Sequence, residues 1–220
     1  MAFTNDIHYV WIDTCCIDKT SSSELSEAIN SMYCWYREAR VCYAFLADIK
    51  TVDQVPQSQW FTRGWTLQEL IASAEMTFFN QDWRELGSKK EPKELISGRT
   101  GIATSILDQT ADLESVCIAQ RMSWAAKRET ARLEDQAYCL LGIFGINMPM
   151  LYGEGKNAFI RLQEEILRIS SDESIFAWKS SHGYRSGLLA DPPSAFEDCA
   201  DITIFQSSSK IPWNLSNKGL

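Results

Sequence analysis

One stretch of the sequence, WFTRGWTLQELI at residues 60–71, combines tryptophan rings with a carboxylate at a spacing that could support chemistry. If a helix already includes Trp65, then Trp65 and Glu69 are four residues apart and share one face of it. An indole beside a carboxylate excludes water, which raises the pKa of the carboxylate. Such a group can hold sugar hydroxyls and stabilise an oxocarbenium-like centre while a glycosidic bond breaks. Trp60 and Trp65 could also stack on a base or a nicotinamide ring.

The same residues fit a purely structural interpretation. Thr66 and Glu69 have the spacing of a helix capping box, and Trp65 with Leu70 would form the matching hydrophobic staple. In that case Glu69 only caps a helix that begins at Thr66. The position at which the helix begins decides between the two roles, and the sequence leaves both open.

Acidic residues near the ends of predicted strands form a second set of candidates. In open α/β sheets, ligands bind beyond the carboxyl ends of the strands. Asp13, Asp18 and Asp48 lie at or just after such ends. We expect Asp48 to cap a turn. Asp13 and Asp18, together with Arg63, are candidates for the rim of a binding site, but two carboxylates leave a metal ion short of ligands, so no metal site is predicted.

Other catalytic motifs are missing or weak. The two histidines, His8 and His182, lie in no recognisable catalytic setting, which argues against Ser-His-Asp or Cys-His hydrolysis. Residues 153–156, GEGK, lack the spacing of a phosphate-binding loop, and we interpret them as a tight turn before a helix.

Composition narrows the possible partners and the compartment. The net charge of −8 and the absence of a basic patch argue against nucleic acids and anionic membrane surfaces as partners. No apolar run reaches the length of a membrane span. The seven cysteines are odd in number, irregularly spaced and without a CxxC pair. Without a signal peptide, they indicate reduced thiols in a cytoplasmic protein and no zinc site.

The first part of the chain reads as an α/β unit. Predicted strands are apolar along their length, and predicted helices carry one apolar stripe. The strands are expected at residues 9–13, 40–49 and 76–80, and the helices at 24–39 and 60–73. This alternation is typical of a parallel sheet covered by helices.

The character of the chain changes after residue 84. A polar stretch at residues 85–97 is expected to be irregular. Three helices and a short strand are then predicted, at residues 116–128, 133–144, 157–169 and 174–178. We therefore divide the chain into an α/β core at 1–84, a helical part at 85–178, and an extension rich in Ser, Pro and Gly at 179–220.

YVWIDTCCIDK at residues 9–19 and RGWTLQEL at residues 63–70 resemble the second and third signature blocks of the fungal heterokaryon incompatibility (HET) domain. Residues 121–166 resemble the stretch that usually follows, and the similarity covers residues 9–178. The resemblance implies an effector of heterokaryon (vegetative) incompatibility, which serves non-self recognition and programmed cell death. Its implied partners are other incompatibility or NLR-type signalling proteins, with self-association possible.

HET domains are considered similar to TIR domains, and the predicted elements here follow the TIR order from its second strand onward. In TIR enzymes the Glu of a W-x-x-x-E motif is the catalytic residue of NAD cleavage, and this pattern falls on Trp65 and Glu69. The resemblance therefore implies an NAD glycohydrolase with NAD as its substrate and no bound cofactor. The alternative is a non-enzymatic module that signals through self-association, with Glu69 as a helix cap.

One signature block of the family is missing. HET domains normally open with a first strand and loop before WID, and only eight residues precede Tyr9. In a flavodoxin-like sheet of order 2-1-3-4-5 the first strand lies between the second and third, so its loss would leave backbone groups unpaired. We therefore expect a fragment or a mis-started chain with weak activity, or another segment that fills the gap.

Overall fold

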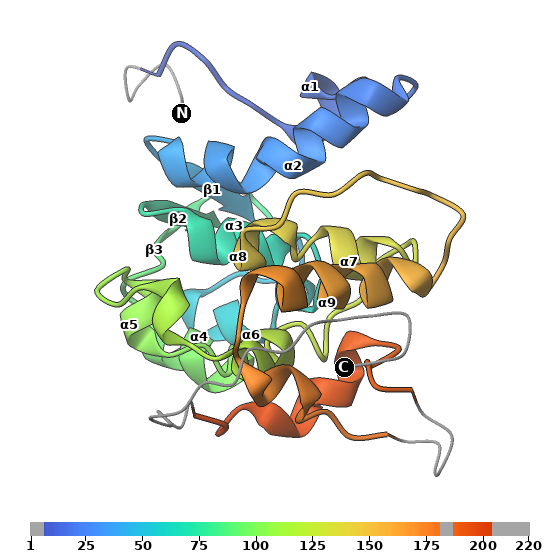
Figure 1. Cartoon of the computed structure of the whole chain (residues 1–220). Coiled ribbons are helices and arrows are strands. Elements are labelled where there is room, and N and C mark those ends of the chain that lie inside the picture. The colour runs from blue at the N-terminus through green and yellow to red at the C-terminus, as the bar shows by residue number, and fades with distance from the viewer. Residues whose placement is uncertain (1–6, 181–186, 204–220) are drawn as a thin grey trace.

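The computed structural model describes residues 7–180 and 187–203. Figure 1 shows helices around a small sheet, with residues 13–38 at one end of the molecule and residues 187–203 at the opposite end. The α-helices are α1 (Asp13–Cys16), α2 (Ser22–Glu38), α3 (Thr66–Ala72), α4 (Lys93–Thr100), α5 (Thr104–Leu107), α6 (Ile118–Ser123), α7 (Asp135–Tyr138), α8 (Leu141–Phe144) and α9 (Asn157–Ile169). The 3₁₀ helices are η2 (Val52–Gln57), η3 (Gln59–Thr62), η4 (Leu113–Ser115), η5 (Glu173–Phe176) and η6 (Pro193–Cys199).

The sheet has three strands in the order β1 (Cys42–Phe45), β2 (Met76–Phe79) and β3 (Glu85–Ser88). β1 and β2 are parallel, with Cys42 opposite Met76, whereas β3 runs antiparallel to β2. The predicted strands at 40–49 and 76–80 are therefore confirmed within narrower bounds. The mixed α/β class is also confirmed, but an all-parallel sheet is not, because β3 returns directly from β2 through a short connection.

The predicted strand at residues 9–13 is wrong. Residues 7–12 are irregular and lead into α1. Tyr9, Val10 and Ile12 are 92%, 57% and 48% exposed, and Trp11 instead packs edge-on against Trp35 of α2. An apolar run becomes a strand only where a neighbouring strand satisfies its backbone groups, and no described strand pairs with this one.

Two long helices are confirmed. α2 begins two residues before the predicted position 24, because Ser21 accepts a hydrogen bond from the Glu24 amide (3.3 Å) and caps a helix that begins at Ser22. The Glu24 carboxylate accepts from the Asp18 amide (2.9 Å), so it also fixes the turn before the helix. α9 has the predicted bounds. The predicted helices at 116–128, 133–144 and 60–73 are each shorter or divided into two pieces.

Two other segments differ from the prediction. Residues 85–97, expected to be irregular, contain β3 and the start of α4. α4 buries only Ile96, so it shows almost no apolar stripe, and it ends at Gly101 in a left-handed conformation (φ +72°). The predicted strand at 174–178 is wrong: residues 174–176 belong to η5, and residues 177–178 are irregular. The Asp172 carboxylate caps η5 by accepting a hydrogen bond from the Ser174 amide (2.9 Å).

The larger of two hydrophobic clusters draws on most of the described chain. It runs from Ile29 to Cys199 and includes Leu67, Ile96 and Leu162, whose side chains are fully buried. Residues from all three predicted segments thus share a core, and the boundaries at 84 and 178 stay predictions. None of the described helices is long and apolar enough to cross a membrane.

Lys89 closes the C-terminal end of α3. Its side chain is 1% exposed, and its ammonium group donates to the carbonyl oxygens of Leu70 (2.9 Å) and Ser73. Burial lowers the pKa of Lys89 to about 8. These carbonyls have no partner within the helix, so Lys89 supplies the hydrogen bonds that the helix end lacks.

Replacing Lys89 by Met should lower the free energy of unfolding by about 2 kcal/mol, because two buried carbonyl oxygens lose their donor. Urea denaturation measures the change. Lys90→Met is the matched control, since Lys90 is half-exposed and pairs with Glu75 at the surface; there we expect a change below about 0.5 kcal/mol. Equal effects of the two substitutions would contradict the capping role of Lys89.

Candidate functional site

The backbone before α3 brings Trp65 and Glu69 to the same side of the helix. Trp65 already has helical torsions (φ −62°, ψ −31°), and within the described residues α3 has no side-chain cap at its N-terminus. The Thr66 hydroxyl points backwards to the carbonyl oxygens of Trp60 (2.5 Å) and Arg63 (2.9 Å). The capping box is therefore not formed, and Glu69 is left for other contacts.

Glu69 is partly buried and carries an altered pKa. Removal of water raises the pKa of its carboxyl to about 7. Arg63 opposes this rise most strongly, and the Asp13 carboxylate adds to it. A hydrogen bond from the Tyr36 hydroxyl and the charge of Arg128 lower the pKa again. A carboxyl that titrates near neutrality through burial and specific neighbours is a feature of functional sites.

Tyr36 of α2 is a site residue that the sequence did not indicate. Burial, followed by the charge of Glu69, raises the pKa of Tyr36 far above its ordinary value, so its hydroxyl keeps its proton. It therefore acts as a hydrogen-bond donor to the Glu69 carboxylate. In the sequence, an inward orientation of Tyr36 is indicated by its position one turn after Met32, on the apolar stripe of α2.

Trp65 joins two parts of the molecule. Its ring packs, with Tyr36, against a small apolar cluster formed by Ile17, Ala28 and Met32. Its indole N–H donates to the carboxylate of Asp135, a buried residue of α7. The Trp65 side chain, which lies on the same side of α3 as Glu69, is thus held by a residue from the second half of the chain.

Arg128 fixes the backbone that leads into α3. Its buried guanidinium donates to the carbonyl oxygens of Trp124 (3.2 Å) and Arg63 (2.8 Å) and to the Thr66 hydroxyl (3.0 Å). Burial lowers the pKa of Arg128 to about 10. With Arg63 held by its backbone, the exposed guanidinium of Arg63 stays near Glu69.

Gly64 is also required by the close packing of the backbone that leads into α3. Its amide donates to the carbonyl of Glu129 (2.8 Å), within an isolated parallel bridge. A Cβ at this position would lie 2.4 Å from a methyl carbon of Thr130 and 3.2 Å from the sulfur of Cys139. Any larger residue here would therefore have to displace the Thr130 side chain that packs against Gly64.

The structure brings together some of the predicted site residues and separates others. Asp13 and Arg63 lie close enough to Glu69 to change its pKa. Asp18 instead accepts hydrogen bonds from the amide (2.8 Å) and hydroxyl (2.7 Å) of Thr20, which lower the pKa of Asp18. Trp60 is 7% exposed and packs against aromatic rings of the core. Asp18 is thus engaged in local hydrogen bonds and Trp60 in core packing, and a role for either residue in substrate binding stays a prediction.

Two structural interpretations from the sequence are confirmed. Asp48 accepts hydrogen bonds from the Ser58 hydroxyl (2.6 Å) and the Gln59 amide (2.7 Å), so it holds the turn before η3. The GEGK residues form a tight turn in which Gly153 and Gly155 have positive φ and donate their amides to Glu134. The described residues hold no cluster of His, Cys, Asp and Glu side chains that could bind a metal ion.

Comparisons with known proteins agree with the resemblance to the HET family. A family described as heterokaryon incompatibility protein (HET) matches residues 1–54. The vegetative incompatibility protein HET-E-1 of Podospora anserina is 44% identical over 170 aligned residues, which cover 72% of this chain. The chain belongs to the heterokaryon incompatibility family. It spans only 12% of the length of HET-E-1.

The HET match ends before the segment that carries Trp65 and Glu69, although it includes Asp13 and Tyr36. A second family, a domain of unknown function (DUF8212), matches residues 157–207, which begin with α9. No solved structure matches the chain. The similarity to a TIR fold therefore stays a prediction.

Proposed function

We propose that this chain is a HET-family module of heterokaryon incompatibility that cleaves NAD between nicotinamide and ribose. The relationship to HET-E-1 supports the pathway. The observation that carries the chemistry is the state of Glu69, a partly buried carboxyl with a pKa near 7 that does not cap its helix. NAD is a substrate in this proposal, and no bound cofactor is required.

The proposed reaction uses the ionised form of Glu69. The bond between the nicotinamide nitrogen and ribose C1′ breaks, and its electron pair leaves with neutral nicotinamide. The carboxylate stabilises the positive charge that develops at C1′. Water then adds to C1′, which yields ADP-ribose and releases one proton. Tyr36 orients the carboxylate, and the exposed cation of Arg63 can face the diphosphate of the substrate.

The pH dependence of nicotinamide release tests the proposal. Because the carboxylate is the active form and its pKa lies near 7, the rate should rise as pH passes through about 7 and level off above about 8. The measurement is the initial rate of nicotinamide release from NAD by the purified chain between about pH 5.5 and 8.5. A rate that is independent of pH over this range would exclude a catalytic Glu69 carboxylate.

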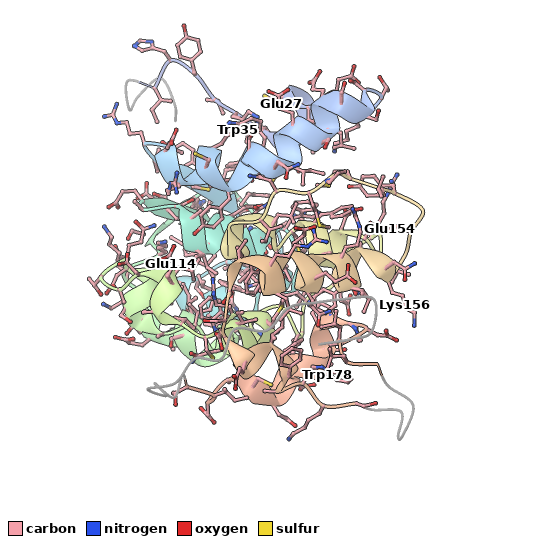
Figure 2. All side chains as sticks on the ribbon, in the orientation of Figure 1. Glu27, Trp35, Glu114, Glu154, Lys156 and Trp178 are labelled. Atoms are coloured by element: carbon pink, nitrogen blue, oxygen red, sulfur yellow. The ribbon has the colours of Figure 1, made fainter. Side chains whose placement is uncertain are left out.

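A second candidate function is supported by one surface feature. Tyr9, Val10 and Ile12 expose apolar side chains in the segment that precedes α1. Trp11 of the same segment packs against Trp35 of α2, which Figure 2 labels. Contiguous exposed apolar residues are typical of association surfaces, so a non-enzymatic module that signals by self-association is the alternative. Sedimentation at increasing concentration tests it: Tyr9→Ser with Val10→Ser should reduce association, and Leu151→Ser, at an exposed site in another loop, should not.

A further inference from the structure

Asp135 is a buried acid that the proposed reaction does not use. Its carboxylate accepts hydrogen bonds from the Tyr152 hydroxyl (2.9 Å) and from the indole N–H of Trp65. Burial raises the pKa of Asp135, and Arg132 is the nearby cation that lowers it. The guanidinium of Arg132 lies over the Tyr152 ring, 4.5 Å from its centre. Two neutral donors from distant parts of the chain thus meet at one buried carboxylate.

The donor on one side, Tyr152, belongs to a firmly held loop. This loop connects α8 to α9, and Figure 2 labels Glu154 and Lys156 where it meets α9. Glu134, next to Asp135, binds the amides of Gly153 (2.7 Å) and Gly155 (3.0 Å). Glu154 accepts hydrogen bonds from the hydroxyl of Tyr138 (2.8 Å) and from Arg161 (2.6 Å). The loop that carries Tyr152 is therefore held by contacts with α7, with Glu134 directly before it, and with α9.

The donor on the other side, Trp65, lies in the surroundings of Glu69. Trp65 and Tyr36 pack against the same apolar cluster, and the Tyr36 hydroxyl is hydrogen bonded to Glu69. A rotation of the indole would disturb this cluster, against which Tyr36 also packs. The contacts thus form a path from the loop through Asp135, Trp65 and the apolar cluster to Tyr36 and Glu69.

We propose that Asp135 and Tyr152 are positioning residues that hold Trp65 in the orientation in which Tyr36 keeps its hydroxyl on Glu69. The importance of this positioning for catalysis rests on the proposed function. The link between Asp135 and the Glu69 carboxyl, in contrast, is a property of the protein without substrate. A purely structural Asp135 would join α7 to the loop and leave the Glu69 carboxyl unaffected.

The pKa of Glu69 distinguishes these two roles. It can be measured on the whole chain without substrate, by ¹³C NMR of labelled glutamate carboxyls, with Glu69→Gln to assign the signal. Asp135→Asn removes a negative charge, which by itself would lower the pKa of Glu69 or leave it unchanged. Loss of the Tyr36 hydrogen bond acts in the opposite direction, because that bond lowers the pKa. A rise in Asp135→Asn therefore reports lost positioning.

We expect the pKa of Glu69 to rise by about half a unit in Tyr36→Phe and by a similar amount in Asp135→Asn. The double variant should show no further rise, because both changes remove the same contact. The indole ¹H–¹⁵N signal of Trp65, assigned with Trp65→Phe, should move in Asp135→Asn. Asp191→Asn is the control: this exposed acid pairs with Lys156, and the Glu69 and Trp65 signals should not change.

A Glu69 pKa that is unchanged or lower in folded Asp135→Asn would overturn the inference. If that variant does not fold, Tyr152→Phe provides the test, since it removes one hydroxyl and no charge, and the same upward shift is expected. None of these measurements requires turnover. Absence of NAD cleavage by the wild-type chain would refute the proposed function alone, and cleavage that survives Glu69→Gln would refute the catalytic role of Glu69. A Glu69 that is essential for cleavage but insensitive to Asp135 would refute the positioning role alone.

Discussion

Glu69→Gln should reduce nicotinamide release by at least about a hundredfold, because the neutral amide cannot stabilise positive charge at the ribose. The substitution keeps the size of the side chain and its ability to accept a hydrogen bond from Tyr36. The measurement is the initial rate above about pH 8, where the wild-type carboxyl is ionised. Glu75→Gln is the control, since Glu75 is an exposed acid that pairs with Lys90 at the surface.

The stability of Glu69→Gln separates a catalyst from a helix cap. The pKa of Glu69 is raised from 4.5 to about 7 in the folded protein. The folded state therefore binds more protons than the unfolded state between these values, and stability falls as pH rises through this window. Gln cannot ionise, so the free energy of unfolding of the variant should not fall in this pH window. At pH 8 the variant should therefore be more stable than the wild type, by roughly 3 kcal/mol at most.

A capping role predicts the opposite sign. Loss of a cap lowers stability by about 1 kcal/mol. Thermal unfolding of wild type and variant at about pH 5 and pH 8 measures the difference. Reduced stability of Glu69→Gln at pH 8, together with no activity in either protein, would return Glu69 to a structural role. Retained NAD cleavage would exclude it as the catalytic group.

The parts of the fold that could be predicted are those in which local signals and tertiary packing agree. α2 has a serine cap and a long apolar stripe, and α9 buries Phe159, Leu162 and Ile166 on one face. β1 and β2 are short apolar runs that lie side by side in the core. In each case, the residues that favour the element are also the residues that the core buries.

The failures occur where pairing or backbone geometry decides. Residues 9–13 have the composition of a strand, but no described strand pairs with them. β3 and α4 are polar, so neither alternation nor an apolar stripe indicates them; β3 forms because β2 offers a free edge. No property of a single segment reveals the presence or absence of a partner.

The candidate site could be predicted only in part for the same reason. The helical spacing of Trp65 and Glu69 was visible in the sequence, but the Tyr36 hydroxyl reaches Glu69 only through tertiary packing. The sequence contains one indication that Asp135 is buried. It lies three residues before Tyr138 and four before Cys139, on a stripe of buried residues. An acid on an apolar stripe is expected to have a buried hydrogen-bond partner.

Gly142→Ala should have the largest effect on stability. Gly142 lies in α8, against α2, and a Cβ there would be 2.1 Å from the Cβ and 2.4 Å from the Cγ of Tyr33. The Cβ of Tyr33 is bonded directly to the backbone of α2 and cannot rotate away, so the helices must separate. We expect a loss of about 3 kcal/mol in the free energy of unfolding, measured by urea denaturation.

Gly98→Ala is the matched control, with the opposite expected sign. Gly98 lies within α4, and nothing is within 4 Å of a Cβ built there. Alanine in an open helical position should increase stability by about 0.5 to 1 kcal/mol. A gain in both variants would show that α2 does not pack against α8 at this distance.

Gly142→Ala should also change the candidate site. Tyr33 and Tyr36 are neighbours on α2, so a displacement of the helix at Tyr33 moves the Tyr36 hydroxyl away from Glu69. If the variant folds, the pKa of Glu69 should rise, as in Tyr36→Phe, because the hydrogen bond that lowers it is lost. A reduced stability with an unchanged Glu69 pKa would show that α2 adjusts at Tyr33 without moving Tyr36.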